Sequence, residues 1–239
     1  MKKSILMILM VLVTVAFGKA SPKAAPKAAS PKNSGVPRAA PTEDKELLKC
    51  ANLVYAGSKS SVCFSEKFLA TIAHETNCQP QQKFSTVRLA KDDMFKYPFS
   101  IMTGEGVFKL LDKERKVLKS YLTRGGFLLA SAGCSSKEWD RAFRQEIKKI
   151  FPDKKMTKIT LKHPIFHSVF DINAIKLKKG GKTHLEGLVI DGKIVMIYSP
   201  EGLNDTGNSG KKGCCCCGGN EIKNSQQINV NIFTYALTH

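Results

Sequence analysis

Two short apolar runs, each followed by a pattern typical of a helix, constrain the fold of this chain most. Residues 97–102 form the first run, and apolar residues then recur at helical spacing over 111–122. Residues 127–132 form the second run, and an apolar stripe follows over 139–150. Strands that alternate with helices of this length need crossover connections. The pattern therefore predicts an α/β domain with a mostly parallel sheet that is covered on both faces.

Two further segments predict helices at the beginning of the domain. Apolar residues recur at helical spacing over 47–55, behind Thr42, and again over 68–73, behind Ser65. Thr and Ser favour the N-cap position of a helix, so both segments are expected to be helical. Gly125-Gly126 is expected to end the helix at 111–122.

The last third of the chain predicts a hairpin. Residues 185–190 and 193–198 are separated by Asp191-Gly192, a strong signal for a tight turn between antiparallel strands. Residues 228–237 fit two structures, because Ile228, Val230 and Ile232 alternate as in a strand, whereas Ile228, Ile232 and Ala236 have helical spacing.

The N-terminus has the pattern of a signal peptide. Lys2 and Lys3 precede an apolar run at 5–17, and Gly18-Lys19-Ala20 supplies small residues at the positions that signal peptidase recognises. The run is shorter than the roughly 20 apolar residues of a membrane span. We therefore expect cleavage after Ala20, export to the periplasm or the extracellular space, and a mature chain without a transmembrane segment.

The expected domain boundaries follow from composition. Residues 1–20 are the signal peptide, and residues 21–43 repeat Pro, Ala and Lys with almost no large apolar residue, which predicts a disordered, semi-stiff linker. Residues 44–239 are long enough for one domain with a full core.

The charge of the chain indicates the class of partner. The net charge is +18, and it would be about +15 after loss of Lys2, Lys3 and Lys19. Such a charge attracts polyanions. The basic residues are dispersed without interleaved aromatic residues, which argues against nucleic acid. An anionic envelope polymer or a small ligand is the expected partner, and the sequence does not identify a cofactor.

Several motifs, in order along the chain, resemble an uncharacterised bacterial family, a domain of unknown function that is assigned to the class I glutamine-amidotransferase-like fold. They are YPFSIMTGEG (97–106), LKSYLTRGGFLLAS (118–131), WDRAFRQEIKKIFPD (139–153), HPIFHSVFDI (163–172), LEGLVIDGKIVMIYSP (185–200) and NVNIFTYALT (229–238). The resemblance implies a three-layer, flavodoxin-like sandwich and a helix for the C-terminal segment. It implies no activity.

Cys134 is the candidate nucleophile. In amidotransferase-like folds the nucleophile is a Cys on a tight strand-to-helix turn, where the helix N-terminus lowers the thiol pKa. Cys134 follows the run at 127–132, and Ser135 and Glu138 have the spacing of a capping box. The usual G-x-C-x-G turn is altered, because Gly133 precedes the Cys directly and Ser136 replaces the second Gly. A small buried thiol at a crowded turn is the alternative.

Other side chains could join such a site. His167, in the turn His163–His167, could act as the base or contact a substrate, and Glu105, between Gly104 and Gly106, could orient a ligand. His163 could instead bond the turn backbone, His167 could pack or face solvent, and Glu105 could cap the next segment. The pair His184 and Glu186 superficially matches the His-x-Glu of class I amidotransferases.

The run Cys214-Cys215-Cys216-Cys217 is the least ordinary feature. Consecutive side chains diverge, so the run does not fit the C-x₂₋₄-C spacing of a zinc tetrad. Three interpretations remain: disulfides, a thiolate site for a soft metal ion such as Cu(I), and an exposed redox loop. Disulfides are favoured for an exported chain. The partners available to the run are Cys50, Cys63, Cys78 and Cys134.

Three classes of function remain: a Cys134-dependent hydrolase or amidotransferase relative, a non-catalytic ligand-binding module, and an accessory component of an envelope assembly. The altered turn around Cys134 favours the last two together over the enzyme.

Overall fold

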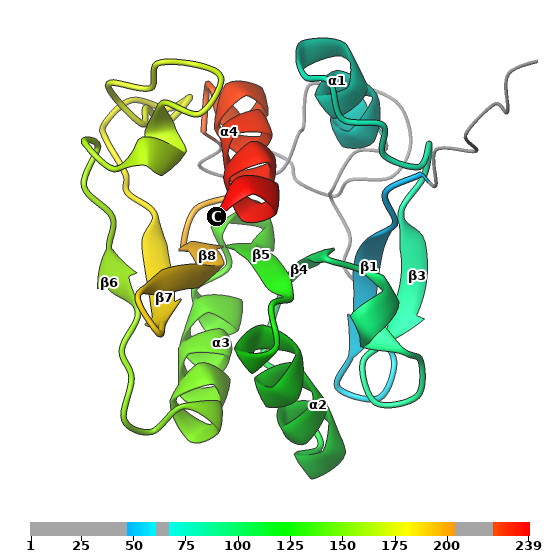
Figure 1. The fold of residues 1–239 in the computed structure, drawn as a ribbon. Helices are drawn as coiled ribbons and strands as arrows, with labels where there is room; N and C mark the ends of the chain where they lie inside the picture. Colours follow the sequence, from blue (N-terminus) through cyan, green and yellow to red (C-terminus); the bar gives the residue numbers. More distant parts are fainter. Residues whose placement is uncertain (1–46, 61–66, 204–221) are drawn as a thin grey trace, which may run out of the picture. The chain divides into compact units, whose positions relative to one another are not determined.

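The computed structural model describes residues 47–60, 67–203 and 222–239 (Figure 1). The expected signal peptide and linker lie outside these ranges, as do Thr42, Cys63, Ser65 and Cys214–Cys217. The described residues form an eight-stranded sheet in the order β2-β1-β4-β5-β8-β7-β6, in which β3 also pairs with β1. The strands are β1 Cys50–Tyr55, β2 Lys59–Ser60, β3 Ser85–Arg88, β4 Phe99–Gly104, β5 Phe127–Ala132, β6 Thr157–Lys158, β7 Glu186–Ile190 and β8 Lys193–Ser199.

The sheet is mostly parallel, as the sequence predicts. Its parallel strands lie in the order β3-β1-β4-β5-β8. Numbered along the chain, this is the order 2-1-3-4-5 of flavodoxin-like sheets. The two apolar runs are neighbours, with Phe99 opposite Phe127 and Gly104 opposite Ala132. The strands β7 and β6 then extend the sheet in antiparallel fashion beyond β8.

Helices cover both faces of the sheet (Figure 1). On one face lie α2 (Asp112–Thr123) and α3 (Lys137–Ile150), whose apolar side chains form one core cluster with the strands. On the other lie α1 (Lys67–Glu75), α4 (Ser225–Thr238) and the short 3₁₀ helix η3 (Pro164–Phe166), which contribute to a second cluster. Two more 3₁₀ turns are η1 (Met94–Lys96) and η2 (Gly133–Ser135). Within the described ranges, no helix is long and apolar enough to cross a bilayer.

The predicted helix at 47–55 is wrong, because this segment contains β1 instead. Cys50, Ala51, Leu53 and Tyr55 are all fully buried, on both faces of the strand. A short strand buried on both faces is apolar at nearly every position, so its sequence also satisfies helical spacing. The helix predicted over 68–73 is confirmed as α1.

The predicted cap of α3 is also wrong, by one residue. The N-cap is Ser136, whose Oγ accepts a hydrogen bond from the N–H of Trp139. The same Oγ accepts a second hydrogen bond, of 3.1 Å, from the N–H of Gly106 in the turn after β4. Ser136, which stands where a G-x-C-x-G pattern would have its second Gly, therefore caps the helix and joins two turns.

The C-terminal predictions are resolved. Residues 186–190 and 193–199 form the hairpin, and Asp191 and Gly192 both have positive φ, as a type I′ turn requires. Residues 225–238 form the helix α4, which the family resemblance favours. The helix is buried nearly all round, including Asn229 and Asn231, and this explains why its apolar pattern has no clear helical period. Asn231 accepts hydrogen bonds from the N–H groups of Val169 and Phe170.

The carboxyl end of β4 is packed too tightly for a side chain. A Cβ at Gly104 would lie 2.1 Å from Tyr55 Oη and 2.7 Å from Trp139 Nε1. Tyr55 Oη donates to Thr103 O at 2.9 Å and accepts from Trp139 Nε1 at 2.7 Å. These bonds fix β1, β4 and α3 against one another at the edge where the candidate site lies.

We predict that Gly104→Ala and Tyr55→Phe each destabilise the protein, by about 1–3 kcal/mol, through overpacking and through loss of buried hydrogen bonds. Their effects should not add. Tyr55→Phe removes the hydroxyl that the new Cβ would meet first, so Gly104→Ala should cost at least about 0.5 kcal/mol less in that background. Urea unfolding of the two single variants and the double variant measures this coupling.

Tyr121→Phe is the matched control, because Tyr121 is another buried tyrosine whose hydroxyl donates to backbone carbonyls, those of Tyr97 and Phe127. Its effect should add to that of Gly104→Ala. If the unfolding free energies of Gly104→Ala were equally non-additive with Tyr55→Phe and with Tyr121→Phe, the contact between residue 104 and Tyr55 Oη would be contradicted.

Candidate functional site

The turns after β4 and β5 lie against each other. Gly133 has no room for a side chain, since a Cβ there would lie 2.9 Å from Gly104 O and 3.4 Å from Glu105 Cγ. Together with the Gly106–Ser136 hydrogen bond, this contact places Glu105 and Cys134 in adjoining turns at the carboxyl edge of the sheet. The structure thus brings together two of the predicted site residues. Their roles stay predictions.

Cys134 has an unusual backbone conformation. It lies in η2 at the carboxyl end of β5 with φ 49° and ψ 29°, and Ser135 follows with φ 53°. Two consecutive non-glycine residues in the left-handed region cost of order 1–3 kcal/mol each. The strained turn leads directly into the capped N-terminus of α3, where the helix dipole favours a negative charge.

The topological switch point, between β1 and β4, is occupied by the protein's own carboxylate. Ligands of flavodoxin-like sheets bind at this point, beyond the carboxyl ends of the strands. Here the N–H groups of Ala56 and Gly57 donate to the buried carboxylate of Glu114, at 3.1 and 3.2 Å, and the N–H of Leu111 donates to it at 2.8 Å. Backbone groups that could hold an anion in this fold therefore hold Glu114 instead.

His163 and His167 have structural hydrogen bonds. His163 is the N-cap of η3, and its Nδ1 accepts from the N–H of Ile165, the alternative noted for this residue. His167 Nδ1 lies 2.9 Å from Asp171 Oδ1, and its Nε2 lies 2.8 Å from Leu161 O. A carbonyl and a carboxylate only accept, so both contacts are hydrogen bonds at once when the ring is an imidazolium. The bond to Asp171, followed by the bond to Leu161 O, raises the pKa of His167 above its usual value.

The cysteine predictions are only in part within the described residues. Cys214–Cys217 and Cys63 lie outside them, so the metal and disulfide interpretations of the run stay predictions. Cys50 and Cys78 are free thiols, and burial, with a smaller effect of Cys78, raises the pKa of Cys50 to about 12. In the part of the chain that the structure describes, no group of three or more His, Cys, Asp or Glu residues could hold a metal ion.

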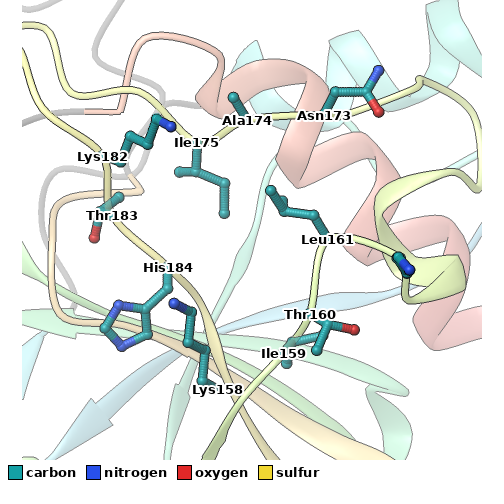
Figure 2. Close-up of a pocket in the computed structure, with 11 residues that line it drawn as sticks. Lys158, Ile159, Thr160, Leu161, Asn173, Ala174, Ile175, Lys182, Thr183 and His184 are labelled. Atoms are coloured by element: carbon teal, nitrogen blue, oxygen red, sulfur yellow. The ribbon is translucent and has the colours of Figure 1, made fainter.

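A separate pocket of about 650 Å³ lies where β6 and β7 extend the sheet (Figure 2). Three segments, 158–162, 173–175 and 182–184, form its walls. Hydrogen bonds from the Ile159 N–H to Leu185 O and from the Thr183 N–H to Ile175 O hold these segments together. The pocket is lined by Lys158, Ile159, Thr160, Leu161, Lys162, Asn173, Ala174, Ile175, Lys182, Thr183 and His184. Figure 2 shows Leu161 and Ile175 pointing toward one another from opposite walls, with Lys158 and His184 on one side and Lys182 on the other.

The pocket is positively charged. Three lysines and a histidine line it, and none of its described lining residues is acidic. Lys158, Lys162 and Lys182 form no ion pair with the described residues, so their charges are available to solvent or to a ligand. The volume falls within the range of small-molecule sites.

A chain of charged side chains supports one wall of this pocket. His184 Nε2 lies 3.3 Å from Glu186 Oε1, and Arg144 of α3 binds both oxygens of Glu186, at 2.8 and 2.7 Å. Arg144 also donates to Asp140, which accepts from Tyr198 Oη at 2.5 Å. Burial alone would raise the pKa of Glu186, but the hydrogen bonds and charge of Arg144, together with smaller effects of His184, outweigh it and the pKa is lowered. The His-x-Glu pair therefore makes contact, and Glu186 is held as a carboxylate by Arg144.

A local excess of lysine in the sequence lies within and around the pocket segments, and the net charge of the whole chain does not reveal it. Residues 154–185 contain eight lysines and one acidic residue, Asp171, which bonds to His167. The lysines are dispersed along the chain, but the pairing of β6 with β7 and the Ile159 N–H to Leu185 O hydrogen bond bring Lys158, Lys162 and Lys182 to one pocket.

We predict that His167 titrates above the usual histidine pKa of about 6.5 and that Asp171→Asn lowers this pKa. Because the pKa of His167 is higher in the folded than in the unfolded protein, protonated His167 stabilises the fold. This stabilisation is fully present below the unfolded pKa and is lost as pH rises through the folded pKa. NMR titration of the histidine rings measures the shift. Asp112→Asn, which removes an exposed carboxylate on α2, is the control. A His167 pKa that Asp171→Asn leaves unchanged would contradict the geometry.

Comparison with known proteins gives a match to a family model. The family model described as Domain of unknown function (DUF4159) matches residues 49–237, which covers β1 through α4. No curated protein matches the chain. The matched region is most of the chain, and the chain therefore belongs to this family of domains of unknown function.

Proposed function

We propose that this domain is an exported, non-catalytic ligand-binding module on a glutamine-amidotransferase-like fold, and that its ligand is an anion of the cell envelope bound in the pocket of Figure 2. The 2-1-3-4-5 order of the parallel strands supports the fold assignment. The signal-peptide pattern of residues 1–20 supports export.

The positively charged lining of the pocket carries the proposal. Lys158, Lys162, Lys182 and His184 line one cavity from two segments, 158–162 and 182–184, and its apolar walls lower the local dielectric. Charges in such a cavity attract an anion more strongly than the same charges spread over a surface. An accessory role in an envelope assembly is compatible with this binding, because a positively charged pocket would hold the domain on an anionic polymer.

We predict that inorganic pyrophosphate, a small probe anion, binds the domain and that the double variant Lys158→Gln/Lys182→Gln weakens binding about tenfold. Isothermal titration calorimetry at low and at moderate salt measures the affinity. Lys113→Gln/Lys119→Gln on the exposed face of α2 removes the same charge and is the matched control. Equal weakening by both double variants would mean that binding reflects net charge and would overturn the pocket proposal.

A second candidate function, Cys134-dependent hydrolysis or group transfer, is supported by the strained backbone of Cys134 at the N-terminus of α3. Strain of this kind is concentrated at functional sites, and a helix N-terminus lowers the pKa of a thiol.

If Cys134 is a nucleophile, iodoacetamide should alkylate it with a pH dependence centred below the ordinary thiol pKa of about 8.5. Mass spectrometry of peptides compares its rate with that of Cys78, which is also partly exposed. Equal rates and equal pH profiles for the two thiols would exclude an activated Cys134.

A further inference from the structure

The pocket of Figure 2 has an apolar wall that an inorganic anion would not use. Ile159, Leu161, Ala174 and Ile175 line it beside the lysines. Ile159 and Ile175 belong to the core cluster on the α1 and α4 side of the sheet, so the wall is continuous with the core. Leu161 is 38% exposed, so its side chain is accessible to a ligand in the pocket.

The positive charge of the pocket comes from the lysines of its lining, Lys158, Lys162 and Lys182. No arginine is among the described residues that line the pocket. Lysine binds an anion as a point charge and is a common phosphate ligand, whereas arginine binds carboxylates and phosphates alike through a planar pair of hydrogen bonds. Lysines around one cavity can therefore hold a compact anion with several oxygens, such as a phosphate.

We propose that the ligand of this pocket is an amphiphilic phosphate, a molecule whose phosphate binds Lys158, Lys162 and Lys182 and whose alkyl chain lies on the wall formed by Ile159, Leu161 and Ile175. The proposal rests on the anion-binding function proposed above and adds the apolar half of the ligand. It explains why the lysines surround buried isoleucines, an arrangement that a purely polar anion does not require.

Three probes test the two halves of the ligand separately. Glycerol 3-phosphate carries the phosphate alone, monomeric dihexanoyl phosphatidic acid carries phosphate and alkyl chains, and dihexanoyl phosphatidylcholine carries the chains with a zwitterionic headgroup. Each buried methylene strengthens binding about fourfold. Phosphatidic acid should therefore bind the full-length protein at least about tenfold more tightly than glycerol 3-phosphate, and more tightly than phosphatidylcholine.

Two variants test where the alkyl chains and the phosphate bind. Leu161→Ser should weaken the binding of phosphatidic acid and leave the binding of glycerol 3-phosphate unchanged. Lys158→Gln/Lys182→Gln should weaken the binding of both. Val189→Ser is the matched control for Leu161→Ser, because Val189 is a 41% exposed apolar residue of β7 outside the pocket lining. Circular dichroism and thermal unfolding establish that each variant is folded before its affinity is interpreted.

The outcomes separate this inference from the proposed function. Equal affinity for phosphatidic acid and glycerol 3-phosphate would overturn the proposal of an amphiphilic ligand and would leave the anion-binding function in place. If no phosphate binds, both proposals are overturned. Phosphatidylglycerol vesicles form the last arm. Vesicle binding that exceeds monomer binding and is unaffected by Leu161→Ser would mean that the lysines contact a membrane surface, and would overturn occupation of the pocket.

Discussion

The parallel pairing of β4 with β5 is the constraint on which the rest of the structure depends. Every residue of both strands is buried, including Ser100, Thr103 and Ser131. A strand that is buried on both faces needs a layer on each, so α2 and α3 cover one side and α1 and α4 the other. The same pairing continues to Gly104 and Ala132, which brings the two following turns into contact at the carboxyl edge.

This packing also determines where a ligand can bind. At the switch point the backbone N–H groups of the β1 turn are already bonded to Glu114, and the turns after β4 and β5 are joined by Gly133 and Ser136. The antiparallel strands β7 and β6 extend the sheet beyond its parallel part, and the segments beside them enclose the lysine-lined pocket. Because β6 is antiparallel to β7 and β7 to β8, β6 runs in the same direction as β8, and its carboxyl end lies at the same edge as Cys134. The network from His184 through Glu186 and Arg144 to Asp140 links the pocket to the N-terminal part of α3.

The sequence predicted the centre of the fold better than its margins. The runs at 97–102 and 127–132, the helices that follow them and the Asp191-Gly192 hairpin are local patterns, and all are confirmed. The helix predicted at 47–55 is wrong because a short strand buried on both faces, with Asn52 as its one polar residue, does not show the alternation of an exposed strand. The position of Cys134 at a strand end could be predicted from its neighbours in the chain. The pocket could not, because Lys158 and Lys182 are brought together only by the pairing of distant segments.

In the proposed function the ligand occupies the lysine-lined pocket and not the turns around Cys134. Amide chemical-shift mapping by NMR during titration with monomeric dihexanoyl phosphatidic acid locates the binding site directly. We expect the largest shifts in residues 158–162, 173–175 and 182–184, which line the pocket. Shifts confined to residues 104–106 and 133–136, at the carboxyl ends of β4 and β5, would contradict it and would place the site at Glu105 and Cys134.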